Sequence, residues 1–255
     1  MMTVFYIMIA AFVAGGMNAL AGGGTFVLFP TLTGVAGLSD KVANIACTLG
    51  LWPASAATVV TARRDLAHIP RTLLWTMALI SLCGGASGAW TLLNTSERTF
   101  TYLIPWLLAF ATLVFAFAKP IARWAGRHQG ERHPGWTVAV ISLQIVIAFY
   151  GGYFGAGIGV LMLAGLSFLG LEDLHQCNAL KVLLATVINA TATLVFLSAT
   201  IPWAYVLPMI AASITGGVLG MKLARRLPAD KLRGVILLVG ITLTLAYFWK
   251  VYGAK

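Results

Sequence analysis

Two glycine-rich stretches and one lysine are the residues of this chain whose types and spacing could do chemistry. The stretches cover residues 15–24 and 151–159, and each interrupts a long apolar segment. Glycine lets a backbone approach a ligand closely, and the first N–H groups of a helix that follows such a break lack intrahelical partners. These N–H groups carry the positive end of the helix dipole and attract anions. Lys181, several residues inside an apolar segment, would add a full positive charge, so the pattern predicts a small-anion site.

The candidate binding residues come from both parts of the chain. The first part contributes Asn18, Gly22, Gly23, Gly24, Thr25 and Asn44. The second part contributes Gly155, Gly157, Gly159, Asn178, Lys181 and Asn189. Two alternatives stay open. The glycines could simply permit tight helix packing, and Lys181 could extend its ammonium to the cytoplasmic interface.

Other chemistry is less well supported by the sequence. Glu172, Asp173 and His175 follow the second glycine stretch, where a histidine could take part in proton coupling, although a solvated loop is the simpler interpretation. A phosphate-binding loop, a metal-ligand cluster and a Ser-His-Asp arrangement are not visible. We therefore expect no cofactor or metal, and neither an ATP-driven pump nor a hydrolase.

Composition places these residues in a membrane protein. Hydrophobic residues make up 60% of the chain, charged residues 9%, and the mean hydropathy is +0.90. Soluble domains contain about a quarter charged residues. The net charge of +10 is then explained by cytoplasmic loops rather than by nucleic-acid binding. The three cysteines lie in apolar segments and do not predict a disulfide framework.

Eight apolar segments must position the candidate site. They cover residues 2–38, 42–61, 72–93, 100–118, 136–171, 176–198, 203–221 and 234–251. Six have about the 20 residues that span a bilayer core, whereas the two that contain the glycine stretches are far longer. The basic stretch 119–134 is predicted as a cytoplasmic linker between a first half, residues 1–118, and a second half, residues 135–255.

The two halves repeat each other beyond the glycine stretches. Matched features occur in the same order in both halves: Asn44 and Asn178, Pro70 and Pro202, and the triplets Gly84-Gly85-x-x-Gly88 and Gly216-Gly217-x-x-Gly220. The triplets have the small-residue spacing that permits close helix packing. A single matched pair would be weak evidence, but several in one order indicate duplication.

The distribution of Lys and Arg predicts how the halves are oriented. If each long segment crosses the membrane once, the 17 Lys and Arg residues divide almost evenly between the two sides. If each enters and returns as a broken hairpin, all except Lys41, Arg98, Lys250 and Lys255 lie on the cytoplasmic side. The positive-inside rule favours the hairpins. The predicted fold is therefore an all-α polytopic membrane protein made of two inverted repeats with broken, re-entrant helices.

The glycine motifs resemble those of one transporter family, the sulfite exporter TauE/SafE family, also called the toluene-sulfonate uptake permease family. The resemblance rests on residues 15–25 (GGMNALAGGGT) with Pro30 and Ala43-Asn44, and on residues 151–159 (GGYFGAGIG) with residues 178–181 (NALK). It implies a multi-pass secondary carrier of the bacterial inner membrane, with seven or eight transmembrane helices in two repeats. The implied substrates are sulfite, sulfonates, sulfoacetate or related organic anions.

The sequence as a whole predicts a transporter that works by alternating access, with a central anion site between the two glycine breaks. Proton coupling is expected only by analogy with other transporters. A passive anion channel is the main alternative, because the same helix dipoles would serve it. A membrane-embedded enzyme or an assembly partner without transport activity is a third possibility.

Overall fold

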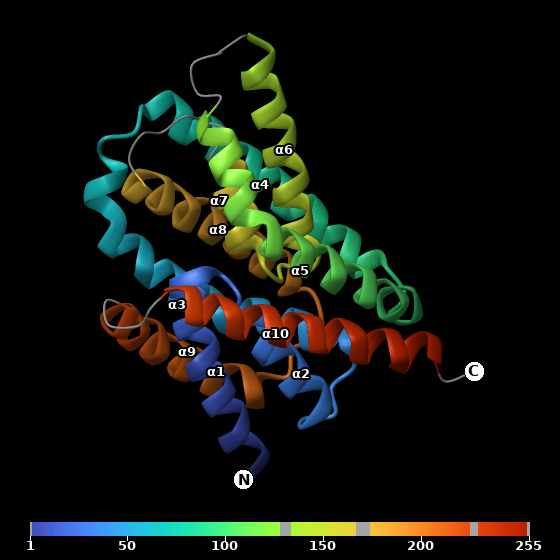
Figure 1. Cartoon of the computed structure of the whole chain (residues 1–255). Helices are drawn as coiled ribbons and strands as arrows, with labels where there is room; N and C mark the ends of the chain where they lie inside the picture. Colours follow the sequence, from blue (N-terminus) through green and yellow to red (C-terminus); the bar gives the residue numbers. More distant parts are fainter. Residues whose placement is uncertain (1, 128–133, 167–173, 225–228, 254–255) are drawn as a thin grey trace.

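Helices account for nearly all of the chain that is described in the computed structural model, which covers residues 2–127, 134–166, 174–224 and 229–253 (Figure 1). Over these residues the secondary structure contains no strand. The helices are α1 (Met2–Ala21), α2 (Thr25–Gly34), α3 (Asp40–Leu66), α4 (Arg71–Asn94), α5 (Glu97–Arg127), α6 (Pro134–Tyr153), α7 (Ile158–Leu166), α8 (Leu174–Phe196), α9 (Trp203–Ala224) and α10 (Ala229–Phe248), followed by a π-helical turn, Trp249–Gly253.

Seven of the described helices are long and apolar enough to cross a membrane: α1, α3, α4, α5, α8, α9 and α10. Two shorter apolar stretches are α2 and, within α6, Val140–Tyr153. The predicted all-α polytopic membrane fold is thus confirmed. Within the predicted linker, residues 119–134, α5 continues as a helix to Arg127, and the role of this stretch as a linker between two halves stays a prediction. Residues 128–133 lie outside the described part of the chain.

Both glycine stretches break a helix. The chain leaves α1 at residues 22–24 and α6 at residues 154–157. Gly22, Gly155 and Gly157 have φ angles of +76°, +74° and +72°, a left-handed conformation that glycine adopts at little cost. A Cβ atom built at Gly24 would overlap the carbonyl oxygen of Ala14, so the chain turns back against α1 after the break.

The arms of each hairpin are unequal. α1 has 20 residues and α2 has 10, which correspond to about 30 Å and 15 Å of helix. α6 has 20 residues and α7 has 9. The long arm α1 is therefore long enough to cross a bilayer core by itself, whereas the arm of a half-crossing hairpin would be too short. The short arm α2 returns over only about half of that distance.

The first helix of the chain packs tightly against α9. A Cβ atom at Gly220 would lie 2.5 Å from the Cα atom of Gly16, and one at Gly216 would overlap the carbonyl oxygen of Phe12. Phe12 contacts Gly216 and, one turn later in both helices, Gly16 contacts Gly220. The residue numbers rise in the same direction along the two helices, so α1 and α9 run parallel. The glycine triplet of the second half is thus the surface on which α1 lies.

The same arrangement recurs between α4 and α6. A Cβ atom at Gly84 would lie 2.5 Å from the Cβ atom of Ala148, and one at Gly88 would overlap the carbonyl oxygen of Phe149 and lie 2.8 Å from the backbone nitrogen of Tyr153. These two helices also run parallel. In each case, the first helix of one half contacts the fourth helix of the other half, so the halves interlock rather than sit side by side. These contacts do not test whether the two halves have opposite orientations in the membrane, which stays a prediction.

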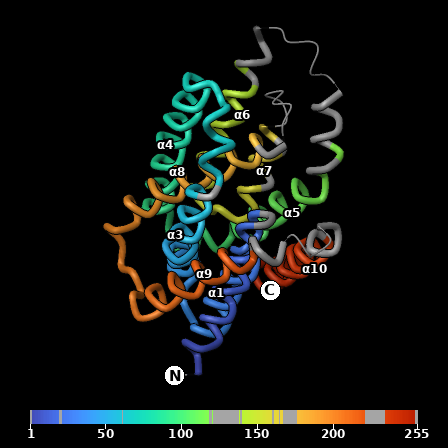
Figure 2. Tube along the Cα trace, turned by 90° about the vertical axis from the view of Figure 1, so that its left-hand side faces the viewer, coloured from blue at the N-terminus to red at the C-terminus, as the bar shows by residue number. Residues whose placement is uncertain are grey.

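The middle of the bundle is formed by α3 and α8, which contact each other; α3 also contacts α9, and α8 also contacts α4. α5 and α10 contact each other and lie together on one side of the molecule (Figure 2). This arrangement encloses the two helix breaks between the central helices and the flanking pair.

Candidate functional site

The two helix breaks meet inside the bundle. A Cβ atom at Gly22 would lie 2.6 Å from the Cα atom of Gly159, and one at Gly157 would lie 3.6 Å from the ring of Phe26. These contacts join the break after α1 to the start of α7, and the break after α6 to the start of α2. Segments more than a hundred residues apart in the sequence therefore form one structural unit.

A cavity of ≈ 40 Å³ lies beside this junction. A cavity needs about 10–15 Å³ to hold one water molecule, so this one has room for a few waters or for a compact anion. Seven of the predicted residues line it: Asn18, Gly22, Thr25, Gly155, Gly159, Lys181 and Asn189. They come from α1, α2, α7 and α8 and from the connections at both breaks.

Five predicted residues do not line the cavity. Gly23 lies against Ile236, Gly24 against Ala14, and Gly157 against Phe26 and Ala111, so these glycines permit close packing rather than ligand contact. Asn178 is exposed at the beginning of α8.

Asn44, the fifth of these residues, is buried in α3, where its Nδ2 donates to the carbonyl oxygen of Tyr153 at 3.0 Å. It therefore holds the end of α6, while its Oδ1 has no hydrogen-bond partner in the described structure.

α3 supplies a face of the cavity that the list of predicted site residues lacks. The additional lining residues on this helix are Cys47, Thr48, Leu51, Ala54, Ser55 and Thr58. Asn18 reaches this face, where its Nδ2 donates to Ser55 Oγ at 3.4 Å. The helical spacing of small polar residues along α3 was the available signal. Such residues are also common at packed membrane helix interfaces, so the spacing alone does not identify a cavity.

Lys181 is the charged residue of the cavity. It is 2% exposed, and its Nζ has no hydrogen-bond partner among the described residues. Its ammonium lies inside the protein instead of extending to the surface. A buried charge without a partner is costly, and such groups are normally paired. The geometry thus leaves Lys181 able to pair with an anion that enters the cavity.

The beginning of α2 lies at the same place. No side chain caps the helix at Gly24, and the N–H groups of Phe26 and Val27 donate to the carbonyl oxygens of Gly23 and Gly24, both at 3.1 Å, which leaves Thr25 as the backbone donor of the first turn. Thr25, the first residue of α2, lines the cavity. The positive end of the α2 dipole and the Lys181 ammonium therefore both act on the cavity.

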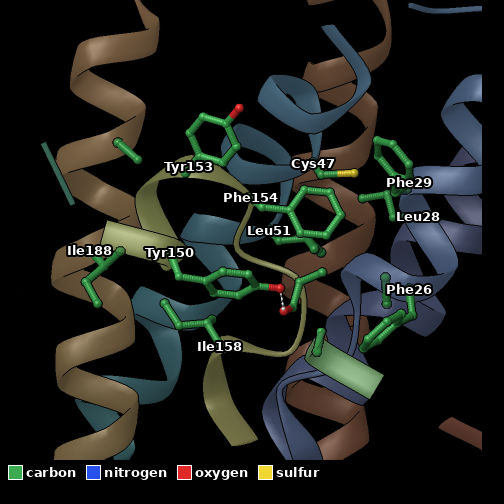
Figure 3. Close-up of a cluster of buried hydrophobic side chains, with 14 of the residues drawn as sticks. Phe26, Leu28, Phe29, Cys47, Leu51, Tyr150, Tyr153, Phe154, Ile158 and Ile188 are labelled. Atoms are coloured by element: carbon green, nitrogen blue, oxygen red, sulfur yellow. Dashed lines mark hydrogen bonds between the residues drawn. The ribbon is translucent and has the colours of Figure 1, made fainter. Parts of the chain in front are cut away.

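The loop at the second break is held by aromatic side chains. Tyr150 Oη donates to the carbonyl oxygen of Ala156 at 2.9 Å, a contact drawn in Figure 3. Phe154, which lines the cavity, packs edge-on against Phe29 and Phe100 with ring centroids 5.9 and 6.2 Å apart. Because these rings are buried, they fix where α7 begins. In Figure 3 the Phe154 ring lies next to Cys47 and faces toward Phe29.

Sequence comparison with known proteins identifies the family of this chain. The sequence model of the family described as Sulfite exporter TauE/SafE matches residues 7–247. The chain belongs to the sulfite exporter TauE/SafE family. The resemblance seen in the glycine motifs is thereby confirmed over nearly the whole chain, both helix breaks included.

Two relatives of this TauE/SafE protein are named as probable membrane transporter proteins. One, from Sinorhizobium, is 26% identical over 245 residues, which cover 94% of this chain and 90% of the relative. The other, from Haemophilus influenzae, is 25% identical over 236 residues, which cover 91% of this chain and 89% of the relative. No solved structure gives a significant match. The chain is a multi-pass membrane protein of a transporter family, and its bacterial relatives are consistent with the inner membrane.

Proposed function

We propose that this protein is a secondary transporter that moves a small anion of the sulfite or sulfonate type by alternating access. The observation that carries the proposal is the buried, unpartnered ammonium of Lys181 in a small polar cavity between two helix breaks. Membership of the sulfite exporter family supports the substrate class. Sites of this kind, at the junction of discontinuous helices, are typical of secondary transporters.

The directions of the helices support the inverted repeat on which alternating access would depend. Figure 1 shows α1 reaching the centre of the molecule from the lower side, next to the N-terminus, and the equivalent helix α6 reaching it from the upper side. α1 runs parallel to α9, as the contacts of Gly216 with Phe12 and of Gly220 with Gly16 require, and α6 runs parallel to α4, as the contacts of Gly84 and Gly88 with Ala148 and Tyr153 require. Rocking of one half against the other would then open the central cavity alternately to the two sides.

The function of the cavity follows from its charge. An oxyanion would accept hydrogen bonds from Lys181 Nζ, from the amides of Asn18 and Asn189, and from the N–H group of Thr25 at the positive end of the α2 dipole. Charge-assisted hydrogen bonds are stronger than neutral ones, so the bound anion would offset the cost of burying the lysine. Proton coupling stays a proposal by analogy; Glu172 and Asp173 lie outside the described residues.

Sulfite flux into proteoliposomes tests the proposal. The full-length protein is expected to give saturable uptake of labelled sulfite with counterflow. Lys181→Ala should lower the uptake at least about tenfold, because it removes one partner of a buried charged contact. Arg71→Ala is the matched control, since Arg71 is an exposed cation at the start of α4 that does not line the cavity.

Other results of this assay would support the alternatives to a transporter or to the proposed site. Linear, voltage-driven current without counterflow would indicate a passive anion channel. Absence of any substrate-dependent flux would indicate a membrane protein without transport activity. Full uptake by Lys181→Ala would remove the lysine from the site.

A further inference from the structure

The cavity is built from equivalent positions of the two halves, although its chemistry is not symmetric. Cys47 lies three positions after Asn44, and Lys181 lies three positions after Asn178. Both Cys47 and Lys181 are 2% exposed, and both line the cavity. The next turns repeat the match, because Leu51 and Ala185 line the cavity, as do Ser55 and Asn189. One half therefore presents a thiol where the other presents an ammonium.

Charge in the cavity is confined to one of these positions. Among the described residues that line it, Lys181 alone has a formal charge. The remaining polar side chains are neutral amides, hydroxyls and one thiol: Asn18, Thr25, Cys47, Thr48, Ser55, Thr58 and Asn189. The described structure thus provides a single unit of positive charge for whatever anion enters.

We infer that the site selects monovalent oxyanions over divalent ones because Lys181 is the one counter-charge among the described residues that line it, and that Cys47 is the position that decides this valence. This inference rests on the proposed function and specifies its substrate class. A bound monoanion makes the loaded cavity electrically neutral. A dianion leaves one negative charge unpaired inside the bundle, where an unpaired charge is costly.

The volume of the cavity points to the same class. A cavity of ≈ 40 Å³ accepts a compact headgroup such as a sulfonate, and it leaves little room for the waters that would hydrate a second charge. The helix dipole of α2 contributes only partial charge, equivalent to about half a unit, which does not balance a second full charge. The preference for a monoanion should therefore be about tenfold or more.

Methanesulfonate and sulfate are the probes that test this valence rule. They are tetrahedral oxyanions of similar size whose charges, one and two, stay constant around neutral pH. Binding of each to the purified full-length protein is measured by calorimetry in detergent, and each is also tested as a competitor of sulfite uptake in proteoliposomes. Wild type should bind methanesulfonate about tenfold or more tightly than sulfate. Equal binding, or tighter binding of sulfate, would overturn the inference.

Variants at the two equivalent positions make the test specific. Cys47→Lys adds a second cation and should move the preference toward sulfate by about tenfold, whereas the neutral size control Cys47→Met should not. The double exchange Cys47→Lys with Lys181→Cys keeps one cation and the same total side-chain volume, so it should keep the preference for methanesulfonate. A double exchange that favours sulfate would contradict the inference.

The failure of the valence rule can be told from failure of the proposed function. Wild-type protein that transports sulfite but binds both probes equally contradicts only the valence rule. Wild-type protein that binds neither probe and transports no sulfite contradicts the proposed function itself. If Cys47→Lys does not fold, the wild-type ratio and the double exchange still decide.

Discussion

Replacement of Gly22 by alanine should separate the two hairpins where they touch. The substitution places a methyl group 2.6 Å from the Cα atom of Gly159 and forces alanine to a φ of +76°. The left-handed conformation costs a non-glycine residue about 1–2 kcal/mol. Overpacking against a backbone that cannot move freely costs about 1–3 kcal/mol. Together these effects predict that Gly22→Ala lowers the free energy of unfolding by about 2–5 kcal/mol.

Two other glycines provide the controls. Gly37 has a φ of +66° and no atom within 4 Å of a built Cβ, so Gly37→Ala has the conformational cost without the overlap. Gly34 has neither a positive φ nor a neighbour within 4 Å, so Gly34→Ala should be nearly neutral. Unfolding is followed by circular dichroism of the full-length protein in a mild detergent as a denaturing detergent is added. If Gly22→Ala costs no more than Gly37→Ala, the contact between the two helix breaks is wrong.

Three further predictions concern the interlocked halves and the site. Gly88→Ala should destabilise the protein by about 1–3 kcal/mol in the same assay, because a Cβ there overlaps the carbonyl oxygen of Phe149, whereas Gly234→Ala, with open space around it, should not. Tyr150→Phe removes the hydrogen bond to the carbonyl of Ala156 and should cost about 0.5–1.5 kcal/mol, with weaker sulfite uptake because the start of α7 is less well fixed; unchanged uptake would make that bond purely structural. Lys181→Met should raise the stability of the substrate-free protein by about 1–4 kcal/mol while it abolishes uptake, because an apolar side chain replaces a buried ammonium without a partner; a loss of stability would indicate that the ammonium is already satisfied.

The sequence was sufficient for the helices and for the two breaks because their signals are local. Apolar length predicts each spanning segment, and clustered glycines predict a break because glycine adopts the positive φ angles found at Gly22, Gly155 and Gly157. The depth of Lys181 within its segment also predicted that the ammonium would be buried. These features depend on neighbours along the chain rather than on how helices pack.

Which residues of each break face the cavity could not be predicted in the same way. Gly22 lines the cavity while Gly23 and Gly24 pack against other helices, and only the tertiary contacts with Gly159, Ile236 and Ala14 decide this. The face of α3 that carries Cys47, Thr48 and Ser55 could be recognised as the counterpart of the Lys181 face, but these residues were left out of the predicted site for a related reason. Neutral residues such as Thr48 and Ser55 satisfy their hydroxyls on the backbone of their own helix, so their sequence pattern does not distinguish a cavity wall from ordinary packing.

The central claim is that an anion sits beside Lys181 between the two helix breaks. Anomalous diffraction from crystals of the full-length protein with selenite, the selenium analogue of sulfite, locates such an anion directly. The account predicts a selenium peak within hydrogen-bond distance of Lys181 Nζ, in the cavity beside the contact of Gly22 with Gly159, and its loss in Lys181→Ala. A selenium peak elsewhere in the bundle, with the cavity beside Lys181 empty, would contradict it.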